Sequence, residues 1–236
     1  MRLDKFIADA GIGTRKEIKQ ALKGGLVCVG GEVMKDAARH INPETDLVTF
    51  AGQKIEYKPF VYLMLNKPAD TVSATYDNRD ATVISLVPEE YSHYELFPVG
   101  RLDKDTEGLL LITNDGVLSH NLLSPKKHVD KRYYARLDGK VAEGDKEKFK
   151  SGIILDDGYK TLPATLEAEI GSNEAYVTIQ EGKFHQVKRM FADTGKHVTY
   201  LKRVSFGPLS LDETLAPGEM RELTDAELAL LKGETV

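Results

Sequence analysis

Residues 1–58 show the pattern of a small mixed unit. Apolar positions recur at helical spacing from Leu3 to Ala10, and Thr14 with Glu17 forms a capping box that opens a second short helix. Glycines at 24 and 25 end that helix, and turn-forming residues then separate short β-prone segments. We therefore expect a small α/β domain at 1–58. Its expected strands are 26–29, 32–34 and 47–50.

A linker at residues 56–59, which ends in Pro59, leads into the second expected domain, 59–236. In this domain the predicted strands outnumber the predicted helices. Runs of strands with few helices between them predict an α+β domain built on a mixed, largely antiparallel sheet. A capping box of Thr224 and Glu227 opens the last expected helix. The expected strands are 60–65, 109–113, 131–137, 162–170, 174–180 and 198–206, and the expected helices lie near 116–123, 145–151, 185–194 and 225–231.

The composition is that of an ordinary globular protein, with 236 residues, 41% hydrophobic and 29% charged. No apolar run approaches the roughly 20 residues of a membrane-spanning helix, and the first residues lack the pattern of a secretory signal. We therefore expect a cytoplasmic protein without membrane association. Cys28 is the single cysteine, so it provides neither an internal disulfide nor a thiolate zinc cage.

The net charge of −5 hides a strong separation of charge along the chain. Residues 126–136 carry five basic side chains against one acid, and residues 183–203 carry six against one. Local basic faces of this kind favour nucleic-acid binding, although a solvated charged surface is the alternative. The second helix adds four cations away from its apolar side, which suits contacts to phosphates: Arg15, Lys16, Lys19 and Lys23.

Three acids lie on a glycine-bounded loop, residues 100–108, directly before an apolar strand. Asp103, Asp105 and Glu107 match the start of a calcium loop, but Asn114 stands where such a loop needs a bidentate glutamate. Ordinary turn carboxylates are the second alternative, and a catalytic carboxylate is the third. We expect no metal.

Three segments together resemble the motifs of the pseudouridine synthases, specifically the RsuA type that modifies ribosomal RNA. They are the stretch 100–108, the triplet Lys131-Arg132-Tyr133 and the stretch 183–190. Asn66-Lys67-Pro68 and the stretch 201–207 also fit that pattern, and residues 1–58 resemble the small RNA-binding domain named after ribosomal protein S-four. The resemblance covers nearly the whole chain.

The resemblance implies a catalytic carboxylate at Asp103, which either attacks the ribose anomeric carbon or removes a ribose proton. That carboxylate must be ionised, so Lys188 occupies the position of its ion-pair partner. Tyr133 corresponds to the tyrosine that stacks on the extruded uracil, whereas Tyr134 should point to the opposite face of the sheet. We expect Arg101, Lys131, Arg189 and Arg203 to bind the substrate.

The expected reaction is a redox-neutral isomerisation of a uridine, which requires no cofactor. The expected partner is ribosomal RNA or an assembling small ribosomal subunit, and the leading target is small-subunit 16S RNA. We expect the protein to be a monomer. Two alternatives remain: an enzyme for large-subunit 23S RNA, and a non-catalytic RNA-binding assembly factor.

Overall fold

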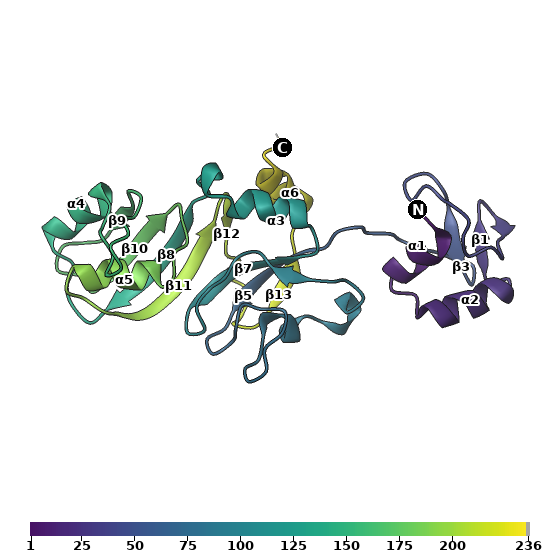
Figure 1. The fold of residues 1–236 in the computed structure, drawn as a ribbon, viewed down its shortest axis with the longest axis horizontal. Coiled ribbons are helices and arrows are strands. Elements are labelled where there is room, and N and C mark those ends of the chain that lie inside the picture. The colour runs from purple at the N-terminus through teal and green to yellow at the C-terminus, as the bar shows by residue number, and fades with distance from the viewer. Residues whose placement is uncertain (235–236) are drawn as a thin grey trace. The chain divides into compact units, whose positions relative to one another are not determined.

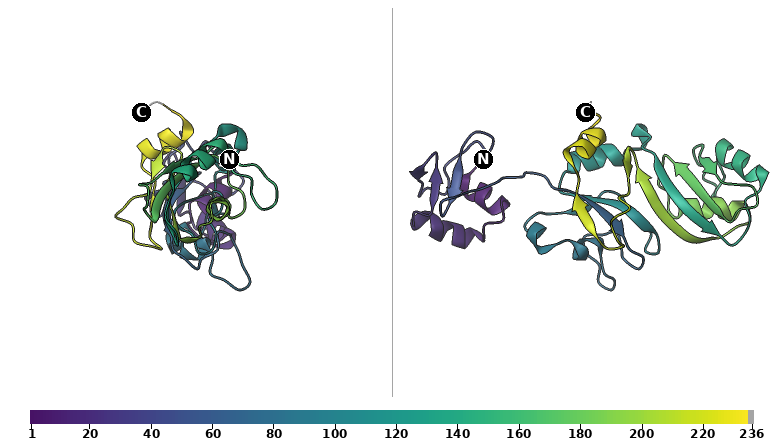
Figure 2. Two further views of the ribbon diagram at one scale, coloured as in Figure 1. Left: turned by 90° about the vertical axis from the view of Figure 1, so that its left-hand side faces the viewer. Right: turned by 180° about the vertical axis from the view of Figure 1, so that it is seen from behind.

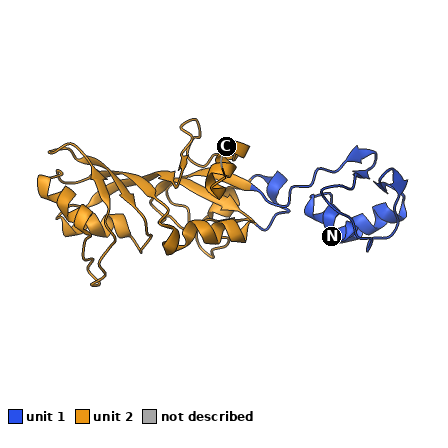
Figure 3. Cartoon of the chain, turned by 90° about the horizontal axis from the view of Figure 1, so that it is seen from above, with its two compact units in different colours: residues 1–61, 88–95 blue, residues 62–87, 96–236 orange. Residues whose placement is uncertain are grey.

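The structure is a computed structural model that describes residues 1–234 (Figure 1). The chain forms two compact units (Figure 3). One contains residues 1–61 together with 88–95, and the other contains 62–87 and the chain from residue 96 onward. The segment 88–95 belongs to the first unit although it lies between strands of the second, which the sequence pattern did not indicate.

The first unit contains two helices and a four-stranded antiparallel sheet in the order β2-β1-β3-β4. The expected capping box is present, since the Glu17 amide donates to Thr14 Oγ1 and the Thr14 amide donates to Glu17 Oε2 at 2.7 Å. Strand β4 was not expected. The elements are α1 (Leu3–Asp9), α2 (Arg15–Lys23), β1 (Val27–Val29), β2 (Glu32–Val33), β3 (Val48–Phe50) and β4 (Gln53–Lys54).

The second unit is built on one mixed sheet in the order β13-β5-β7-β11-β8-β10-β9, with β6 beside β7 and β12 beside β11. All pairs are antiparallel except β7 with β11, so the expectation of a mixed, largely antiparallel sheet is confirmed. Strand β11 links the two halves of the sheet (Figures 1 and 2). The strands are β5 (Tyr62–Lys67), β6 (Phe97–Pro98), β7 (Glu107–Thr113), β8 (Lys131–Leu137), β9 (Thr165–Glu167), β10 (Glu174–Ile179), β11 (Val198–Phe206), β12 (Leu209–Ser210) and β13 (Met220–Glu222).

The parallel pair β7–β11 depends on one glycine. Gly108 lies opposite Arg203, and a side-chain carbon at residue 108 would overlap the Arg203 backbone oxygen. Its φ of +101° also disfavours any other residue. The loop that carries Asp103 therefore enters the middle of the sheet directly.

Helices cover the two halves of this sheet separately. Phe149 of α4 packs against Phe191 of α5 with ring centroids 5.0 Å apart; α4 contacts β9 and α5 contacts β11. Helices α3 and α6 lie side by side, and their leucines pack against β5 and β7 (Figure 1). The helices are α3 (Gly116–Leu123), α4 (Glu143–Ser151), α5 (Gln186–Asp193) and α6 (Asp225–Lys232), with short 3-10 turns at Val83–Leu86, Glu89–Tyr91 and Pro125–Lys127.

The expected helices are confirmed to within two residues. The strand expected at 162–170 covers only Thr165–Glu167; its late start follows from Pro163, which has no amide to donate to the ladder. Within residues 1–234, no helix has the length and apolar character needed to cross a membrane.

Candidate active site

The loop that carries Asp103 is held by hydrogen bonds on both sides of that residue. Ser73 Oγ accepts from the Leu102 amide at 3.1 Å and donates to the Leu102 carbonyl at 2.9 Å. After Asp103, its carbonyl accepts from the Thr106 amide at 3.0 Å. The Asp103 side chain is 26% exposed, so it is largely shielded from solvent, and it lines a cavity.

Lys67 of β5 holds the same loop through hydrogen bonds to its backbone. Its side chain is fully buried, and its ammonium group donates to the carbonyls of Pro68, Lys104 and Thr106 at 2.9–3.1 Å. Burial lowers the pKa of Lys67 to about 8, and the nearby carboxylates, Asp105 first among them, oppose that shift. Lys67 therefore acts as a positioning residue for the loop. The sequence offered one signal for it, the Asn66-Lys67-Pro68 match.

Lys188 of α5 reaches the loop from the other half of the sheet. Its Nζ lies 3.2 Å from Asp103 Oδ2 and 2.6 Å from Asp105 Oδ1. Partial burial of Asp105 opposes its ionisation, but the hydrogen bond and charge of Lys188 outweigh burial and hold the pKa of Asp105 below its usual value. The expected pairing of Lys188 with Asp103 is present, and Asp105 shares the cation.

His185 is a neighbour of Asp103 that the sequence interpretation missed. Its Nε2 lies 3.6 Å from Asp103 Oδ1, and its ring stacks on Phe184 with centroids 3.8 Å apart. The backbone of His185 has φ of +49°, a left-handed conformation that few residues other than glycine adopt. A strained residue at the start of α5, beside a shielded carboxylate, is typical of a functional site.

Tyr133 lies on the inner face of β8 and is 7% exposed, whereas Tyr134 points to the other face. There Tyr134 packs with Tyr176 and Tyr200 at centroid distances of 5.4 and 6.1 Å. The expectation that the two tyrosines face opposite sides is therefore confirmed.

Two adjoining cavities meet at Tyr133. The smaller, about 60 Å³, is lined by Asp103, Tyr133 and His185, and the larger, about 670 Å³, by Lys131, Tyr133 and Arg203. Both are also lined by Arg101 and Lys183. Asp103 and Tyr133 thus face one opening with cations around it.

The predicted substrate-binding residues fall into three groups. Arg101 is exposed and lines both cavities, whereas Lys131 and Arg203 are buried and line the larger one. Arg189 lies elsewhere: it forms ion pairs with Asp156 and Asp157, the latter at 2.7 Å, and lines neither cavity. The predicted role of Arg189 in substrate binding stays a prediction, and in this structure its guanidinium is paired with these two acids.

The three acids of the loop do not meet at a single point: Asp103 and Asp105 share Lys188, whereas Glu107 lies apart from them. Asp105 faces Lys188, and Glu107 begins β7 and accepts a hydrogen bond from the Tyr200 hydroxyl at 2.7 Å. Among residues 1–234, no three His, Cys, Asp or Glu side chains are placed to hold a metal ion together. The calcium-loop alternative therefore has no geometric support.

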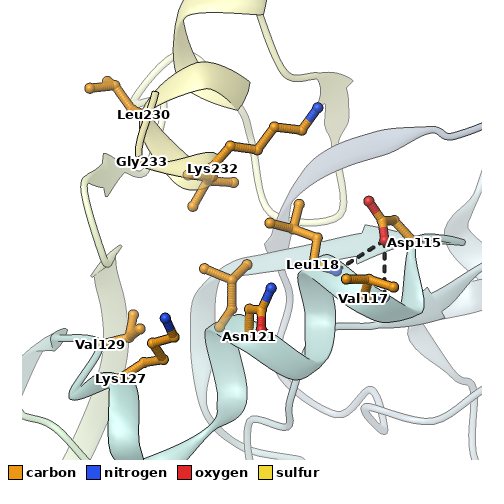
Figure 4. A pocket seen from close by; sticks show the side chains of 11 residues that line it. Asp115, Val117, Leu118, Asn121, Lys127, Val129, Leu230, Lys232 and Gly233 are labelled. Atoms are coloured by element: carbon orange, nitrogen blue, oxygen red, sulfur yellow. Dashed lines mark hydrogen bonds between the residues drawn. The ribbon is translucent and has the colours of Figure 1, made fainter. Parts of the chain in front are cut away.

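A further cavity of about 390 Å³ lies between α3 and α6 (Figure 4). The carboxylate that lines it, Asp115, accepts hydrogen bonds from the amides of Val117 and Leu118 and from the Tyr62 hydroxyl, at 2.8–3.0 Å. Asp115 is thus engaged as the cap of α3, and its carboxylate is already bound to three donors of the protein.

The basic helix of the first unit is as expected. Arg15, Lys16, Lys19 and Lys23 are all exposed on α2, while Ile18, Ala21 and Leu22 are buried.

A shielded carboxylate between a lysine and a histidine, beside a buried tyrosine and a cationic cavity, is an arrangement that suits an enzyme acting on an anionic substrate. Comparison with known proteins gives the family. The model of the RNA pseudouridylate synthases matches residues 61–193, and the model of the S4 domain matches residues 1–47. The chain belongs to the RNA pseudouridylate synthase family, and the matched range contains Asp103, Tyr133 and Lys188.

Relatives of similar length support this assignment. A Bacillus subtilis protein described as an uncharacterized RNA pseudouridine synthase is 50% identical over 98% of both chains. The ribosomal small subunit pseudouridine synthase A of Escherichia coli K12 is 41% identical over 97% of this chain and 99% of its own. A crystal structure of a pseudouridylate synthase matches with a TM-score of 0.69 and 37% identity, covering 98% of this chain and 99% of that one.

Proposed function

We propose that this pseudouridine synthase isomerises a uridine of small-subunit 16S ribosomal RNA. The observation that carries the proposal is the Asp103 carboxylate, held by Lys188 at 3.2 Å and facing a cavity that Tyr133 also lines. Relatives named ribosomal small subunit pseudouridine synthase A, 41–44% identical over nearly the full chain, support the small-subunit target. We assign RNA binding to residues 1–58 and catalysis to 59–236.

The chemistry requires little beyond one ionised carboxylate. The bond from ribose C1′ to N1 of uracil breaks, the bond from C1′ to C5 forms, the C5 proton leaves and N1 gains a proton, with no change in oxidation state. Asp103 acts at the ribose, either as a nucleophile at C1′ or as a base toward a ribose proton. Lys188 places a positive charge 3.2 Å from this carboxylate in its shielded position.

The uridine must leave its stack before Asp103 can reach the ribose. Tyr133 then provides a surface on which the uracil stacks, and it is suitably placed to assist loss of the C5 proton. Arg101 lines both cavities, and it either enters the space left by the base or binds the flanking phosphates. Lys131 and Arg203 bind the substrate in the larger cavity.

The decisive test is tritium release. Small-subunit and large-subunit ribosomal RNA carrying tritium at C5 of uridine are incubated separately with the protein, and the modified position is then mapped. Release from small-subunit RNA supports the proposal. Release from large-subunit RNA alone would establish the alternative target, and tight binding without any release would establish a non-catalytic assembly factor.

The same assay on assembling small subunits and on free RNA identifies the preferred substrate form. We expect the protein to act as a monomer in the cytoplasm, where ribosomal RNA is modified. Sedimentation of the full chain with and without RNA tests the monomer.

A further inference from the structure

Two buried cations lie together on the inner face of the sheet. Lys131 of β8 is 8% exposed and Arg203 of β11 is 2% exposed. Both approach the ring of Phe206, at 5.4 Å for Lys131 Nζ and 4.9 Å for the Arg203 guanidinium carbon. Arg203 pairs in register with Tyr133, so the two cations stand on the same side of the sheet as the stacking tyrosine.

Neither cation has an acidic partner within residues 1–234. Lys131 Nζ donates to the Val129 carbonyl at 2.8 Å, and Arg203 Nε donates to the Leu109 carbonyl at 2.7 Å. Arg203 Nη2 is buried without any hydrogen-bond partner. Burial, together with the charge of Arg203, lowers the pKa of Lys131 to about 8, and the charge of Asp130 only partly opposes that shift.

The fold neutralises another buried lysine in the ordinary way. Lys196 and Asp145 are 9% and 8% exposed and form an ion pair at 2.8 Å. By contrast, Asp130, the acid next to Lys131 in sequence, is exposed. Its carboxylate accepts a hydrogen bond from Gln180 Nε2 at 2.9 Å and forms no ion pair with Lys131. Two adjacent buried cations without a carboxylate are costly unless an anion from outside offsets their charge.

The cavity beside them is suited to such an anion. Its volume is about 670 Å³, and its lining includes five lysine or arginine side chains but only one carboxylate. That carboxylate, Glu181, already accepts from the Tyr159 hydroxyl at 2.7 Å and from the Leu162 amide at 2.8 Å. The lysine and arginine side chains are Arg101, Lys126, Lys131, Lys183 and Arg203.

We propose that Lys131 and Arg203 form the buried end of a phosphate-binding subsite, which holds one phosphodiester next to the uridine that enters the Asp103 cavity. The subsite rests on the proposed function, because the adjoining cavity must receive the target nucleotide. The phosphate oxygens accept from the Arg203 guanidinium and from the Lys131 ammonium, and the bound linkage fixes the ribose relative to Asp103.

The first test uses inorganic phosphate and no RNA. Calorimetric titration of the full chain at constant ionic strength should show saturable binding, at least tenfold weaker in Lys131→Met. Lys202→Met is the matched control, because Lys202 precedes Arg203 on β11 and lines a different cavity. Absence of saturable binding, or equal binding by wild type and Lys131→Met, would overturn the subsite whatever the enzyme does.

The second test separates an RNA phosphodiester from a free anion. Each linkage around the mapped uridine is replaced singly by an uncharged methylphosphonate, and affinity is measured for the three proteins. One replacement should weaken wild type and Lys202→Met about tenfold and leave Lys131→Met within about twofold. If no single linkage matters to wild type, the RNA assignment is wrong. Lys131→Gln replaces Lys131→Met if circular dichroism shows that the latter does not fold.

Failure of the proposed function has a different signature. If wild type releases no tritium from intact RNA, but binds phosphate and does so more tightly than Lys131→Met, the proposed reaction is wrong and the subsite stands. Tritium release by a wild type that is insensitive to every linkage would refute the subsite and keep the reaction.

Discussion

The Lys188 ammonium lies 3.2 Å from the Asp103 carboxylate, although 85 residues of chain separate the two positions. Asp105 approaches the same ammonium at 2.6 Å. One cation therefore serves two carboxylates, and only Asp103 also lines the cavity with Tyr133. This arrangement distinguishes the roles of the two acids and leads to the first two predictions.

Asp103→Asn should reduce pseudouridine formation by at least about 10³-fold and leave RNA affinity within about twofold, because the amide keeps the shape but loses the charge and the nucleophile. Tritium release and a binding titration measure the two effects. Asp105→Asn is the control and should retain most activity. Persisting wild-type activity in Asp103→Asn would refute the catalytic assignment.

Lys188→Met should lower kcat/KM by about 10²-fold or more, because two neighbouring carboxylates are left without their shared cation. Lys188→Arg should stay within about tenfold of wild type, since the charge is kept while the geometry changes. Equal losses in both variants would show that the shape of the lysine matters more than its charge.

Lys67→Met should destabilise the protein by about 2 to 4 kcal/mol, because the carbonyls of Pro68, Lys104 and Thr106 lose their buried donor. Since the same loop carries Asp103, kcat should fall more than RNA affinity. Urea unfolding and tritium release measure these changes. Lys104→Met is the control in the same loop, because its ion pair with Asp80 is exposed and contributes little. A variant with unchanged kcat would remove Lys67 as a positioning residue.

Replacing the four cations of α2 by glutamine should weaken RNA binding and flatten its salt dependence. Each lost phosphate contact reduces the slope of log affinity against log salt by about 0.7 to 0.9. Binding titrations at several salt concentrations measure the slope. A matched variant removes four exposed lysines of the second unit, Lys140, Lys148, Lys150 and Lys160. Equal slopes for the two variants would mean that α2 contributes only general charge.

The ion pair between Glu227 and Arg221 at the start of α6 should make the stability of the protein depend on pH, and Glu227→Gln tests this. Glu227 accepts two hydrogen bonds of 2.8 Å from the Arg221 guanidinium, which lowers the pKa of Glu227 to about 2. The carboxylate binds its proton more weakly in the folded state, so its stabilisation is complete above about pH 4.5 and is lost as pH falls toward 2.

At pH 7 the Glu227→Gln variant should therefore be less stable than wild type by about 1 kcal/mol, the value reduced by partial exposure of the pair. Urea unfolding at pH 7, 4 and 3, followed by circular dichroism, should show the difference shrinking with acidification. A difference that stays constant with pH would assign the effect to packing.

Local features of the fold could be predicted because they depend on neighbours in sequence. The capping boxes at Thr14 and Thr224 and the alternation along β8 are local patterns, and the structure contains all three. The boundary of the first unit was harder to predict, since segment 88–95 belongs to it through contacts distant in sequence.

The amino-acid sequence by itself determined the residue types of the site, through motifs that matched Asp103, Tyr133 and Lys188 to a known chemistry. Only the tertiary structure decided which groups share that site. The parallel pairing of β7 with β11, permitted by Gly108, joins the two halves of the sheet. The tertiary structure also decided that His185 approaches Asp103 and that Arg189 pairs with other acids. It likewise placed Lys131 and Arg203 in the interior without an acidic partner. Side-chain partners depend on distances across the fold, which residue spacing along a chain does not specify.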